Sequence, residues 1–385
     1  MKITLVTETY LPFIAGVSSS SDSIARFMAK KGHQVTIISP RPVLPTTKSE
    51  QDLNLIYTPS TPDFIFKGKP MSLWPLPLPV MIREITKEKV NILHIQEAGA
   101  LGIAALITAK IRKIKVVGAL HLTPEQIVRF IKINPFNLTV TGINFLLKVF
   151  YNSCDALMVP TQTFAQMLGK IGVRKKIVVV SNGVDTGKFA PGEKDQEVIK
   201  KYQLPQDKIL FFFLGRMDKD KNIDTIIKAL SLTSDKIHLI IAGQGAEENN
   251  LKQLAHEQKV YPKITWLGFI PDSDIVKLYN SMDGFILMSP FEVQSIVTLQ
   301  AISCGLPVIC SKEGALPELC HDNQNGFLID TYNFQTLAQK MEILTDDENL
   351  RKKFGDQSRE ISLPHEKNRN LQKLEDLYKS LTLIG

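Results

Sequence analysis

The sequence has 385 residues and a net charge of +7, with 44% hydrophobic and 22% charged residues. At roughly 100–200 residues per domain this length predicts two domains, and the composition excludes a disordered or fibrous protein. Apolar runs such as residues 209–214 are far shorter than the about 20 residues that span a bilayer. The first ten residues include Glu8 and lack a small-residue cleavage site. We therefore expect no transmembrane helix, no secretory signal and a cytoplasmic location.

Charge is unevenly divided along the chain. Residues 1–188 carry 23 Lys and Arg against 11 Asp and Glu, a balance of +12, whereas the remainder carries 23 against 28, a balance of −5. The asymmetry favours an anionic partner for the first half, and a solvated basic surface is the alternative. No zinc finger, ribonucleoprotein motif or basic helix is recognisable in the sequence, so we expect no nucleic-acid partner.

Cysteine and histidine patterns argue against several kinds of site. The cysteines lack the paired spacing of a zinc site or a disulfide framework, which suits structural thiols in a reducing compartment. The sequence has no CxxC and no histidine pair at helical spacing, and no Asp-x-Asp pattern is recognised directly after a predicted strand, so no metal site is predicted. It has no GxSxG motif either, which leaves a Ser-His-Asp mechanism unsupported.

The first half of the chain alternates predicted strands and helices. Residues 1–7 form an apolar, β-branched run, and a loop containing Pro12 and Gly16 follows it. Residues 22–31 have the helical period and residues 34–39 the strand pattern, so this stretch has the length of one βαβ unit. Further strands are expected at residues 92–95, 116–119, 156–159 and 177–180.

The alternation restarts after a polar linker at residues 187–194, which contains Pro191 and Gly192. Before it, residues 73–80 contain three prolines and predict an extended loop. The second cycle has strands at residues 209–214, 237–242, 264–267, 284–288 and 307–310, and helices at residues 223–230, 275–281, 297–303 and 366–381. We expect two doubly wound α/β domains, with ligands outside the carboxyl ends of their strands.

A charged loop, residues 215–222, directly follows the strand 209–214 and precedes a helix. A guanidinium and an ammonium beside free helix N–H groups can neutralise a diphosphate. Arg216 and Lys221 are therefore candidates for holding phosphate. An ordinary charged surface turn is the alternative.

A second candidate group opens the helix after the strand 284–288. Glu292 follows that strand, and Ser295 and Ile296 begin the helix, so a carboxylate stands beside outward-pointing amides. This arrangement suits a site that holds sugar hydroxyls and phosphate, and simple helix capping is the alternative.

Three glycines and one histidine also lie at predicted strand ends. Gly243 and Gly245 follow the strand 237–242, where backbone can approach a ligand closely, although a tight turn explains them equally well. Gly16, in the first strand-to-helix loop, can admit a phosphate or simply make the turn. His121 follows an apolar run and precedes a loop, which distinguishes it from the other six histidines.

The order of these motifs resembles that of family 4 retaining glycosyltransferases over nearly the whole chain. Those enzymes have the GT-B architecture, in which two Rossmann-like domains face a cleft. The resemblance implies domains at residues 1–187 and 188–365, and a C-terminal helix, residues 366–385, that crosses back to the first domain. The matching motifs are TETYLPFIAGV, ARFMAKKGHQVTII, SNGVDTGKF, GRMDKDKN, GQG, WLGF, PFEVQSIVTLQAISCGLPVI and GALPELCHDNQNGFLID.

The same resemblance implies a role for each candidate. Arg216 and Lys221 would hold the donor diphosphate and Glu292 the sugar hydroxyls. His121 would lie beside the transferred sugar. The remaining donor-binding positions are Gly16, near donor and acceptor; Gly243 and Gly245; Ile270, whose backbone would meet the base; Ser295 and Ile296, whose amides would meet phosphate and sugar; and Gln300.

Two departures from the family pattern affect the expected donor pocket. Gln300 stands where the family usually has a second glutamate that grips the ribose, and a neutral amide makes a weaker hydrogen bond than a carboxylate. Val293 and Ser295 stand where glycines usually flank the aromatic residue, and Ala15 replaces the first glycine of the opening loop. These changes predict a tighter pocket with altered donor affinity or nucleotide preference.

The stretch ALHLTPEQIVRFIKINPF resembles family members that glycosylate lipids at the cytoplasmic membrane face. Basic side chains in this stretch and shortly before it could adsorb to anionic lipid, and a core-facing helix with solvated lysines is the alternative. The residues in question are Arg112, Lys113, Lys115, Arg129 and Lys132, with Phe130, Ile131, Ile133 and Phe136 between and after them.

The sequence therefore predicts a retaining hexosyltransferase that uses a nucleotide diphosphate sugar, a hydroxyl acceptor such as a membrane glycolipid precursor, and no cofactor or metal. We expect it in the cytoplasm, peripheral at the inner face of the plasma membrane. The alternatives are a GT-B epimerase or phosphorylase and a catalytically weak nucleotide-sugar binding subunit.

Overall fold

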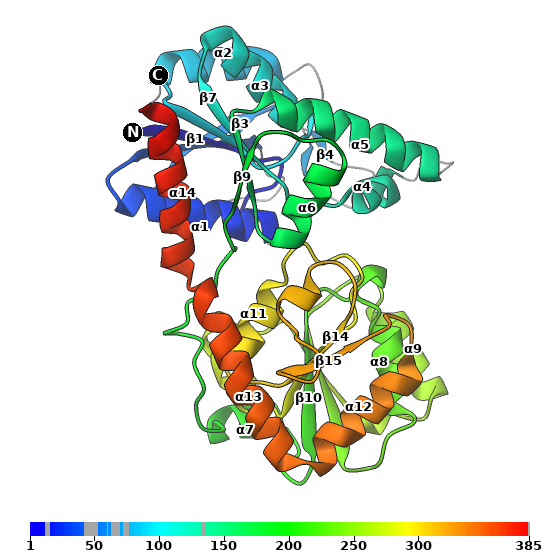
Figure 1. The fold of residues 1–385 in the computed structure, drawn as a ribbon. Helices are drawn as coiled ribbons and strands as arrows, with labels where there is room; N and C mark the ends of the chain where they lie inside the picture. Colours follow the sequence, from blue (N-terminus) through cyan, green and yellow to red (C-terminus); the bar gives the residue numbers. More distant parts are fainter. Residues whose placement is uncertain are drawn as a thin grey trace. The chain divides into compact units, whose positions relative to one another are not determined.

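The protein, described here by a computed structural model, forms two compact units (Figure 1). The N-terminal unit consists of Met1–Asn182 with Asn368–Gly385, and the C-terminal unit of Gly183–Lys367. The residues that the structure describes are 1–11, 16–41, 53–59, 61–62, 70–71, 77–131 and 136–383. The chain passes between the units after Asn182 and after Lys367. The segments next to these two points are hydrogen-bonded, because Lys367 N donates to Val184 O at 3.0 Å.

A parallel sheet forms the centre of the N-terminal unit. Within the described residues its strand order is β3-β2-β1-β6-β7-β8-β9. The strands are β1 (Lys2–Val6), β2 (Gln34–Pro40), β3 (Asn54–Thr58), β6 (Ile92–Ile95), β7 (Lys115–Ala119), β8 (Ala156–Val159) and β9 (Lys176–Val179). All of β6 and β8 is buried, as expected where helices cover both faces of a parallel sheet. β4 (Thr61–Pro62) and β5 (Pro70–Met71) form a separate antiparallel pair.

Helices connect these strands. They are α1 (Gly16–Lys30), α2 (Pro77–Glu88), α3 (Ala100–Arg112), α4 (Pro124–Ile131), α5 (Phe136–Ser153) and α6 (Gln162–Lys170). α3 connects β6 to β7, and α5 lies in the connection from β7 to β8. Right-handed crossovers that run in the same direction place their helices on the same sheet face. α3 and α5 are therefore neighbours, as Figure 1 shows.

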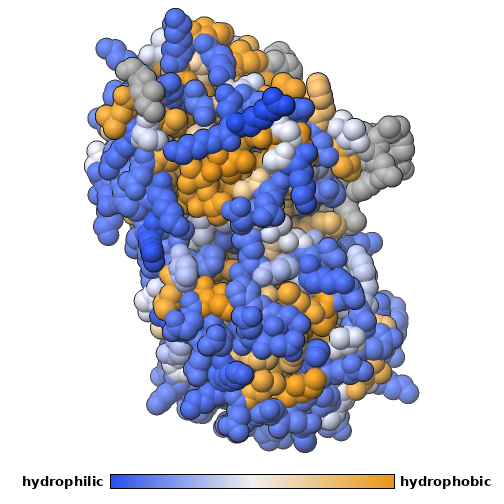
Figure 2. Space-filling model, in the orientation of Figure 1, coloured by the Kyte–Doolittle hydropathy of each residue, from blue (hydrophilic) through white to orange (hydrophobic). Residues whose placement is uncertain are grey.

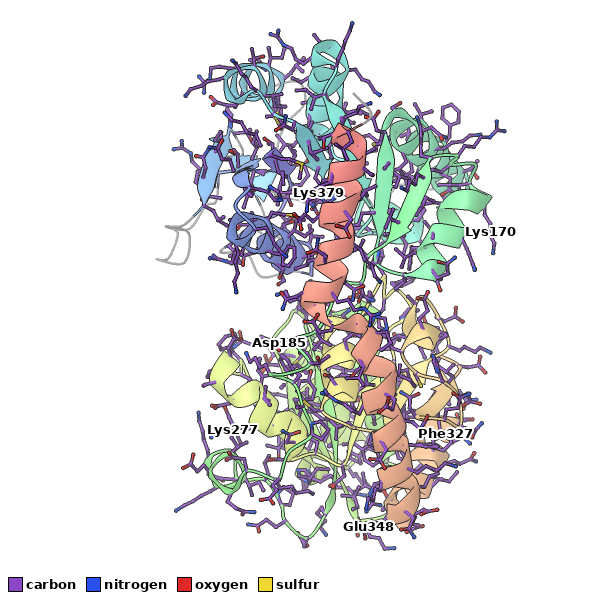
Figure 3. All side chains as sticks on the ribbon, turned by 60° about the vertical axis from the view of Figure 1, so that its left-hand side comes forward. Lys170, Asp185, Lys277, Phe327, Glu348 and Lys379 are labelled. Atoms are coloured by element: carbon purple, nitrogen blue, oxygen red, sulfur yellow. The ribbon has the colours of Figure 1, made fainter. Side chains whose placement is uncertain are left out.

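The last helix, α14 (Lys367–Thr382), supplies part of the N-terminal core. Its Leu374 and Tyr378 are buried in one cluster with Leu5 of β1. Glu375, also on α14, accepts hydrogen bonds from His33 Nε2 at 3.0 Å and from Lys379 Nζ at 2.6 Å; Figure 3 labels Lys379 on this helix. Burial favours the neutral acid, but these hydrogen bonds outweigh it and lower the pKa of Glu375 to about 2.

The C-terminal unit has a second parallel sheet, with the order β12-β11-β10-β13-β14-β15 in the described residues. Its strands are β10 (Ile209–Leu214), β11 (Ile237–Ala242), β12 (Ile264–Gly268), β13 (Gly284–Leu287), β14 (Val308–Ser311) and β15 (Gly326–Ile329). Its helices are α7 (Gln196–Lys201), α8 (Ile223–Leu230), α9 (Glu248–Glu257), α10 (Asp272–Asn280), α11 (Ile296–Ser303), α12 (Phe334–Asp346) and α13 (Glu348–Ser362). Buried aromatic residues of β10 lie at the centre of its core.

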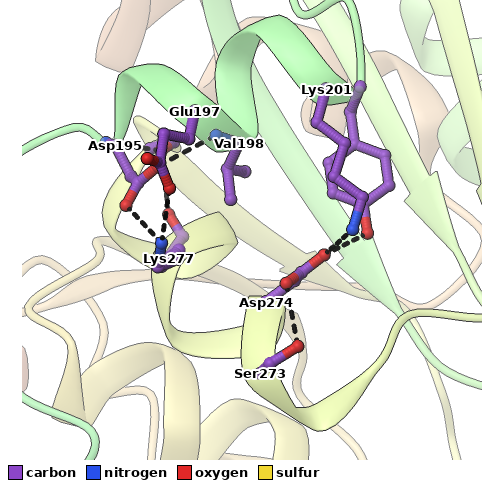
Figure 4. Close-up of polar contacts among 9 residues, drawn as sticks. Asp195, Glu197, Val198, Lys201, Ser273, Asp274 and Lys277 are labelled. Carbon is purple, nitrogen blue, oxygen red and sulfur yellow. Dashed lines mark hydrogen bonds and ion pairs between the residues drawn. The ribbon is translucent and has the colours of Figure 1, made fainter.

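Two clusters of charged side chains tie α7 to α10 (Figure 4). Lys277 lies 3.0 Å from Asp195, the residue that caps α7. Asp274 accepts from Lys201 Nζ at 2.5 Å and from the Tyr202 hydroxyl at 2.7 Å. These hydrogen bonds lower the pKa of Asp274 to about 2, and the two clusters fix α7 to α10 within the C-terminal unit. The expected linker at residues 187–194 also lies within this unit, and its Phe189 is buried in the core.

In each sheet the direction of the connections reverses beside the first strand. β1 lies between β2 and β6, and β10 lies between β11 and β13. Ligands of doubly wound α/β proteins bind outside the carboxyl ends of the strands at such switch points. The loops after β1 and β6, and after β10 and β13, are therefore the expected places for functional side chains.

The structure corrects two of the expected elements. α1 begins at Gly16 rather than at residue 22. The sequence did not indicate its first turns, because they consist of small polar residues without an apolar period. The expected loop at residues 73–80 is wrong for residues 77–80, which open α2. Proline is tolerated in the first turn of a helix, where its missing N–H has no intrahelical partner. Residues 73–76 lie outside the described residues.

Three further features bear on function. No helix in the described part of the chain is long and apolar enough to span a membrane. All four cysteines, Cys154, Cys304, Cys310 and Cys320, are free and buried, and burial raises the pKa of Cys154 and of Cys304 to about 12. Among the described residues, no three His, Cys, Asp or Glu are grouped so that they could hold a metal ion.

Candidate functional site

Two charged side chains meet at the switch point of the C-terminal unit. The loop after β10 leads through a short 3-10 helix, η2 (Lys219–Lys221), and Glu292 follows β13. Lys221 Nζ lies 2.5 Å from Glu292 Oε1, and the two side chains are only 17% and 15% exposed. The structure thus brings together the lysine expected to hold phosphate and the carboxylate expected to hold sugar hydroxyls.

Opposite charge outweighs burial in this pair. Burial by itself lowers the pKa of the Lys221 ammonium, but the charges of Glu292 and Asp220 raise it above its ordinary value. Burial likewise raises the pKa of Glu292, but the charge and hydrogen bond of Lys221, with a hydrogen bond from Ser289, bring it below its ordinary value. Both groups are therefore charged at neutral pH, and each stabilises the charge of the other.

Backbone contacts hold both members of the pair in place. Asn222, which ends η2 in a left-handed conformation, donates its side-chain amide to Met288 O at 3.0 Å and so joins the two loops. Ala315 N donates to Glu292 O at 2.9 Å. A Cβ on Gly314, whose φ is +62°, would lie 2.8 Å from the same oxygen. The glycine of the GALPE motif is therefore required for this close approach.

Arg216 lies on the same loop but pairs with its neighbour Asp218 at 2.5 Å, and its side chain is 52% exposed. Its charge still helps to lower the pKa of Glu292, after the larger effect of Lys221. Asp220 lies 3.6 Å from Lys221 Nζ. Asp218 and Asp220 form an Asp-x-Asp pattern in the loop after β10, so the expectation of no such pattern after a strand was wrong. Each of the two carboxylates contacts a cation.

α11 begins at Ile296, shortly after Glu292 in the chain. Ser295 caps this helix, and its hydroxyl accepts hydrogen bonds from Thr298 N at 3.2 Å and from Thr298 Oγ1 at 2.8 Å. The capping role considered for this stretch is thus fulfilled by Ser295 rather than by the glutamate. Ile296 is the first helical residue, and its amide belongs to the first turn, whose N–H groups have no partner within the helix.

Gln300 lies one turn further along α11. Its Oε1 is 3.2 Å from the Tyr279 hydroxyl, which also lies 3.0 Å from Val297 O. Tyr279 is fully buried, and burial keeps its pKa well above the ordinary value. Its single proton serves one of these two acceptors at a time.

Gly243 and Gly245 have a structural reason to be glycine. A Cβ on Gly243 would overlap the carbonyl oxygen of Gly215, and one on Gly245 would overlap the backbone of Met217. The loops after β10 and β11 therefore pack backbone against backbone. Ile270 is buried and packs in the core of this unit, just before α10.

The N-terminal unit places His121 beside Gln96. His121 Nε2 lies 2.9 Å from Gln96 Oε1, and each residue follows the end of a neighbouring strand. This orientation of the amide assigns the ring proton to Nε2 and leaves Nδ1 as an acceptor. Burial lowers the pKa of His121 to about 4, so the ring is neutral at neutral pH.

A second histidine, His94, lies in β6, the strand that Gln96 follows. His94 is fully buried, and its Nδ1 lies 2.6 Å from the Tyr378 hydroxyl on α14. Burial, with a smaller contribution from His121, lowers the pKa of His94 to about 3. Gln96 and Tyr378 were not predicted as site residues. The strand alternation that puts residues 94 and 96 on one face signals Gln96, whereas nothing in the local sequence signals Tyr378.

The loop after β1 is held by carboxylates. Glu8 accepts a hydrogen bond from Leu101 N at 2.6 Å, at the start of α3, and Glu97 accepts one from Glu8 N at 2.9 Å. Gly16 is exposed and opens α1, and a Cβ there would meet nothing within 4 Å. Ala15 lies outside the described residues. Glu8 and Glu97 therefore fix the first residues after β1 against the start of α3.

Comparison with known protein families gives two matches that together span most of the chain. A model described as Glycosyltransferase Family 4 matches residues 14–188. A model described as Glycosyl transferases group 1 matches residues 194–361. The division between the two matches falls near the division between the two units.

Curated relatives and solved structures agree with these matches. An α-monoglucosyldiacylglycerol synthase from Streptococcus pneumoniae is 27% identical over 340 residues, 85% of this chain and 75% of the relative. A GDP-mannose-dependent α-mannosyltransferase from Corynebacterium glutamicum is 24% identical over 90% of this chain and 81% of the relative.

Among solved structures, a sucrose-phosphate synthase from Thermosynechococcus elongatus has a TM-score of 0.83 at 17% identity and covers all of both chains. HepE from Anabaena, solved with UDP, has a TM-score of 0.81 at 17% identity, over 99% of this chain and 100% of its own. These similarities show the GT-B fold. The chain belongs to glycosyltransferase family 4 and consists of two parallel-sheet α/β units of the GT-B type.

Proposed function

We propose that this protein is a retaining glycosyltransferase that moves a hexose from a nucleotide diphosphate sugar to a hydroxyl acceptor. The observation that carries the proposal is the buried Lys221–Glu292 ion pair at the carboxyl ends of β10 and β13. Beside the amino end of α11, this pair offers a cation, an anion and free backbone amides. That combination suits a ligand with an anionic diphosphate and neutral hydroxyls, and HepE of the same fold was solved with UDP.

On this proposal the pair separates when the donor binds. Lys221 turns from Glu292 to the diphosphate, and the half-exposed Arg216 leaves Asp218 to reach the same group from the solvent side. Glu292, which Lys221 keeps ionised, accepts hydrogen bonds from the sugar hydroxyls. Once the donor is bound, these charges lie beside the diphosphate and the sugar before the bond breaks, so they can stabilise the transition state without further reorganisation.

The other candidates complete the donor pocket. The amides of Ser295 and Ile296 bind phosphate and sugar, Gln300 faces the ribose, and the backbone of Ile270 meets the base. Gly243 and Gly245 let the loop after β11 lie close to the diphosphate. From the N-terminal unit, His121 would offer Nδ1 to a hydroxyl of the transferred sugar, and Gly16 would border donor and acceptor.

The transfer is balanced without an added reagent. The bond between C1 of the sugar and the β-phosphate oxygen breaks, and C1 bonds to the acceptor oxygen on the same face. The acceptor proton passes to the departing phosphate oxygen. Negative charge grows on the diphosphate, where Arg216, Lys221 and the α11 amides are aimed. We therefore expect transfer to persist in the presence of EDTA.

A membrane lipid is the proposed class of acceptor. A curated relative named α-monoglucosyldiacylglycerol synthase, from Acholeplasma laidlawii, is 23% identical over 85% of this chain and 84% of its own, in addition to the pneumococcal relative. The balance of +12 over residues 1–188 suits an anionic surface. The proposed location is the cytoplasmic face of the membrane.

The test is transfer from a panel of nucleotide sugars to diacylglycerol in mixed micelles and to a soluble alkyl glycoside, with and without EDTA. We expect one donor to be consumed and the product to have the α configuration by NMR when the donor is α-linked. A β product contradicts retention. Donors that bind but are not consumed, with or without acceptor, indicate a nucleotide-sugar binding protein and contradict the proposal.

A further inference from the structure

The outer face of α3 and α5 carries apolar side chains that the proposed donor site does not use. We call this surface the α3–α5 face. Three of its side chains, Ile111, Phe145 and Leu146, are 64%, 63% and 62% exposed. The face is made of Ile103, Ile107 and Ile111 on α3 and Phe145, Leu146 and Val149 on α5, all of them exposed.

Helical spacing groups these residues along each helix. Ile103, Ile107 and Ile111 are four residues apart, so they form a single stripe along α3. Phe145 and Val149 are likewise four apart on α5, which is the neighbour of α3 on the same sheet face. In Figure 2, part of the surface over α3 and over the adjoining end of α5 is orange, the colour of hydrophobic residues.

Both helices already bury another apolar face against the sheet. Ala105 and Ala109 of α3, and Leu147 and Phe150 of α5, are buried. A helix at the surface of a globular protein normally presents polar residues on the side away from the core. Contiguous exposed apolar surface, especially where polar residues surround it, marks interaction sites.

The charge of the same helices is of one sign. The sequences of α3 and α5 contain no Asp or Glu. Exposed cations accompany the apolar residues: Lys110 and Arg112 on α3, Lys113 directly after it, and Lys148 on α5. Arg112 and Lys113 are two of the basic residues expected to meet lipid, whereas Lys132 and Ile133, also expected there, lie outside the described residues.

We propose that the α3–α5 face docks on the surface of an anionic lipid bilayer. Apolar side chains enter the boundary between headgroups and acyl chains, and the surrounding cations meet lipid phosphates, as for interfacial helices. A second copy of this chain fits less well, because it would bring the same cations to the interface. The proposal extends the proposed function by naming the surface from which a lipid acceptor would be taken.

Vesicle binding tests this assignment without donor or acceptor. The protein is sedimented with vesicles of phosphatidylglycerol and phosphatidylcholine, and with phosphatidylcholine alone, at low and high salt. One variant, Ile107→Ser/Ile111→Ser/Phe145→Ser/Leu146→Ser, removes apolar contacts. Another, Lys110→Gln/Arg112→Gln/Lys113→Gln/Lys148→Gln, removes charge. Matched controls on the C-terminal unit are Leu232→Ser/Ile343→Ser, which are exposed apolar positions, and Lys352→Gln/Lys353→Gln, which are exposed cations.

We expect the wild-type protein and both controls to bind anionic vesicles, and the apolar variant to bind roughly tenfold more weakly at any salt. The charge variant should bind anionic and neutral vesicles equally, and salt should not change its binding. In the wild-type protein, salt screens the attraction between these cations and the lipid phosphates beyond a Debye length of about 8 Å, and the charge variant lacks that attraction. Each variant should unfold at the wild-type temperature within a few degrees, since only exposed residues are changed.

Three results would overturn the proposal. The first is that the wild-type protein does not bind anionic vesicles. The second is that the apolar variant and the charge variant both bind as tightly as the wild-type protein. The third is that the wild-type protein is a dimer and the substitutions of the apolar variant dissociate it. Transfer to the soluble acceptor, measured separately, reports on the proposed function. Soluble transfer without vesicle binding contradicts the docking surface alone, and vesicle binding without transfer from any donor contradicts the proposed function alone.

Discussion

The two units both hold buried ionisable side chains near the carboxyl ends of their central strands, but in opposite charge states. In the C-terminal unit Lys221 and Glu292 are both charged, because each lies against its opposite. In the N-terminal unit His94 is fully buried and His121 half-buried, and in the described part of the chain neither lies against an opposite charge. Loss of solvation lowers the pKa of each ring far below its ordinary value. The same loss of solvation therefore gives an ion pair in one unit and neutral rings in the other.

The difference shows what each place can do. A buried ion pair can exchange its internal partner for a charged ligand, which suits a diphosphate and its sugar. Neutral histidines can donate and accept hydrogen bonds without repelling a cation or attracting an anion. A neutral His121 beside the reacting sugar would orient hydroxyls rather than stabilise charge. The predictions below disturb one state or the other.

Lys221→Met should have the largest effect. It removes a positive group from the departing diphosphate, which costs on the order of 2–4 kcal/mol of transition-state stabilisation and at least tenfold in turnover. It also leaves Glu292 buried and unpaired, which lowers the free energy of unfolding by about 1–3 kcal/mol. Steady-state kinetics and urea unfolding measure the two effects.

Two variants serve as comparisons for this change. Arg216→Ala should lower turnover similarly but leave stability near wild type, since this side chain is half exposed. Lys228→Met, on the exposed surface of α8, should change neither. Wild-type kinetics in both Lys221→Met and Arg216→Ala would remove the phosphate role from this loop.

Mild acid should destabilise the N-terminal unit first. The folded-state pKa values of about 3 for His94 and about 4 for His121 lie below the ordinary 6.5. The folded chain then binds fewer protons than the unfolded chain, so stability present above pH 6.5 is lost as the pH falls. The loss is about 1.4 kcal/mol per pH unit for each histidine.

The C-terminal pair responds in a lower pH range. Because the pKa of Glu292 is lowered from 4.5, its contribution is lost only as the pH falls below that value. Hydrogen exchange of β6, β7, β10 and β13 between pH 7 and pH 5, corrected for intrinsic rates, should show weakening in β6 and β7. His94→Gln should reduce the slope for those strands. An unchanged slope in that variant would show that His94 is not the group responsible.

Gln96→Leu should have a smaller effect on transfer. The variant removes the acceptor that holds the His121 ring, and the loss of one neutral hydrogen bond, about 0.5–1.5 kcal/mol, should lower kcat/KM roughly three- to tenfold. Gln96→Glu should instead raise the pKa of His121 and move the acid limb of the pH–rate profile upward. If both variants change stability but leave that limb in place, Gln96 has a structural role only.

Gln300→Glu should have the smallest effect. If Gln300 faces the ribose, a carboxylate there should lower KM for the donor a few-fold and leave kcat nearly unchanged, because charge-assisted hydrogen bonds are stronger than neutral ones. The Tyr279 hydroxyl can donate to either side chain. An effect confined to kcat would show that residue 300 lies near the reacting bond instead.

The strands and helices with strong local patterns could be predicted from the sequence. β10 and α8 have the expected bounds because an unbroken apolar run and a clean helical period define them. The family and the GT-B fold, inferred from the order of the motifs, are confirmed. The start of α1 and residues 77–80 were predicted wrongly because small polar residues and prolines are usually typical of loops.

The remaining features depend on contacts between distant residues. The sequence placed Lys221 and Glu292 at separate strand ends, but their contact requires β10 and β13 to be neighbours. The packing of α14 on β1, and the hydrogen bond between Tyr378 and His94 that comes with it, join distant parts of the chain. The α3–α5 face likewise appears only when two crossover helices lie side by side.

A double-mutant cycle tests most directly whether Lys221 and Glu292 form the donor site. Kinetics with one established donor and urea unfolding are measured for Lys221→Met, Glu292→Gln and the double variant. We predict that the double variant recovers most of the stability lost in Lys221→Met, since no unpaired charge remains buried. Its turnover should nevertheless stay at least roughly a hundredfold below wild type. A stable double variant that transfers sugar within about threefold of wild type would show that the pair is structural, and would contradict the account.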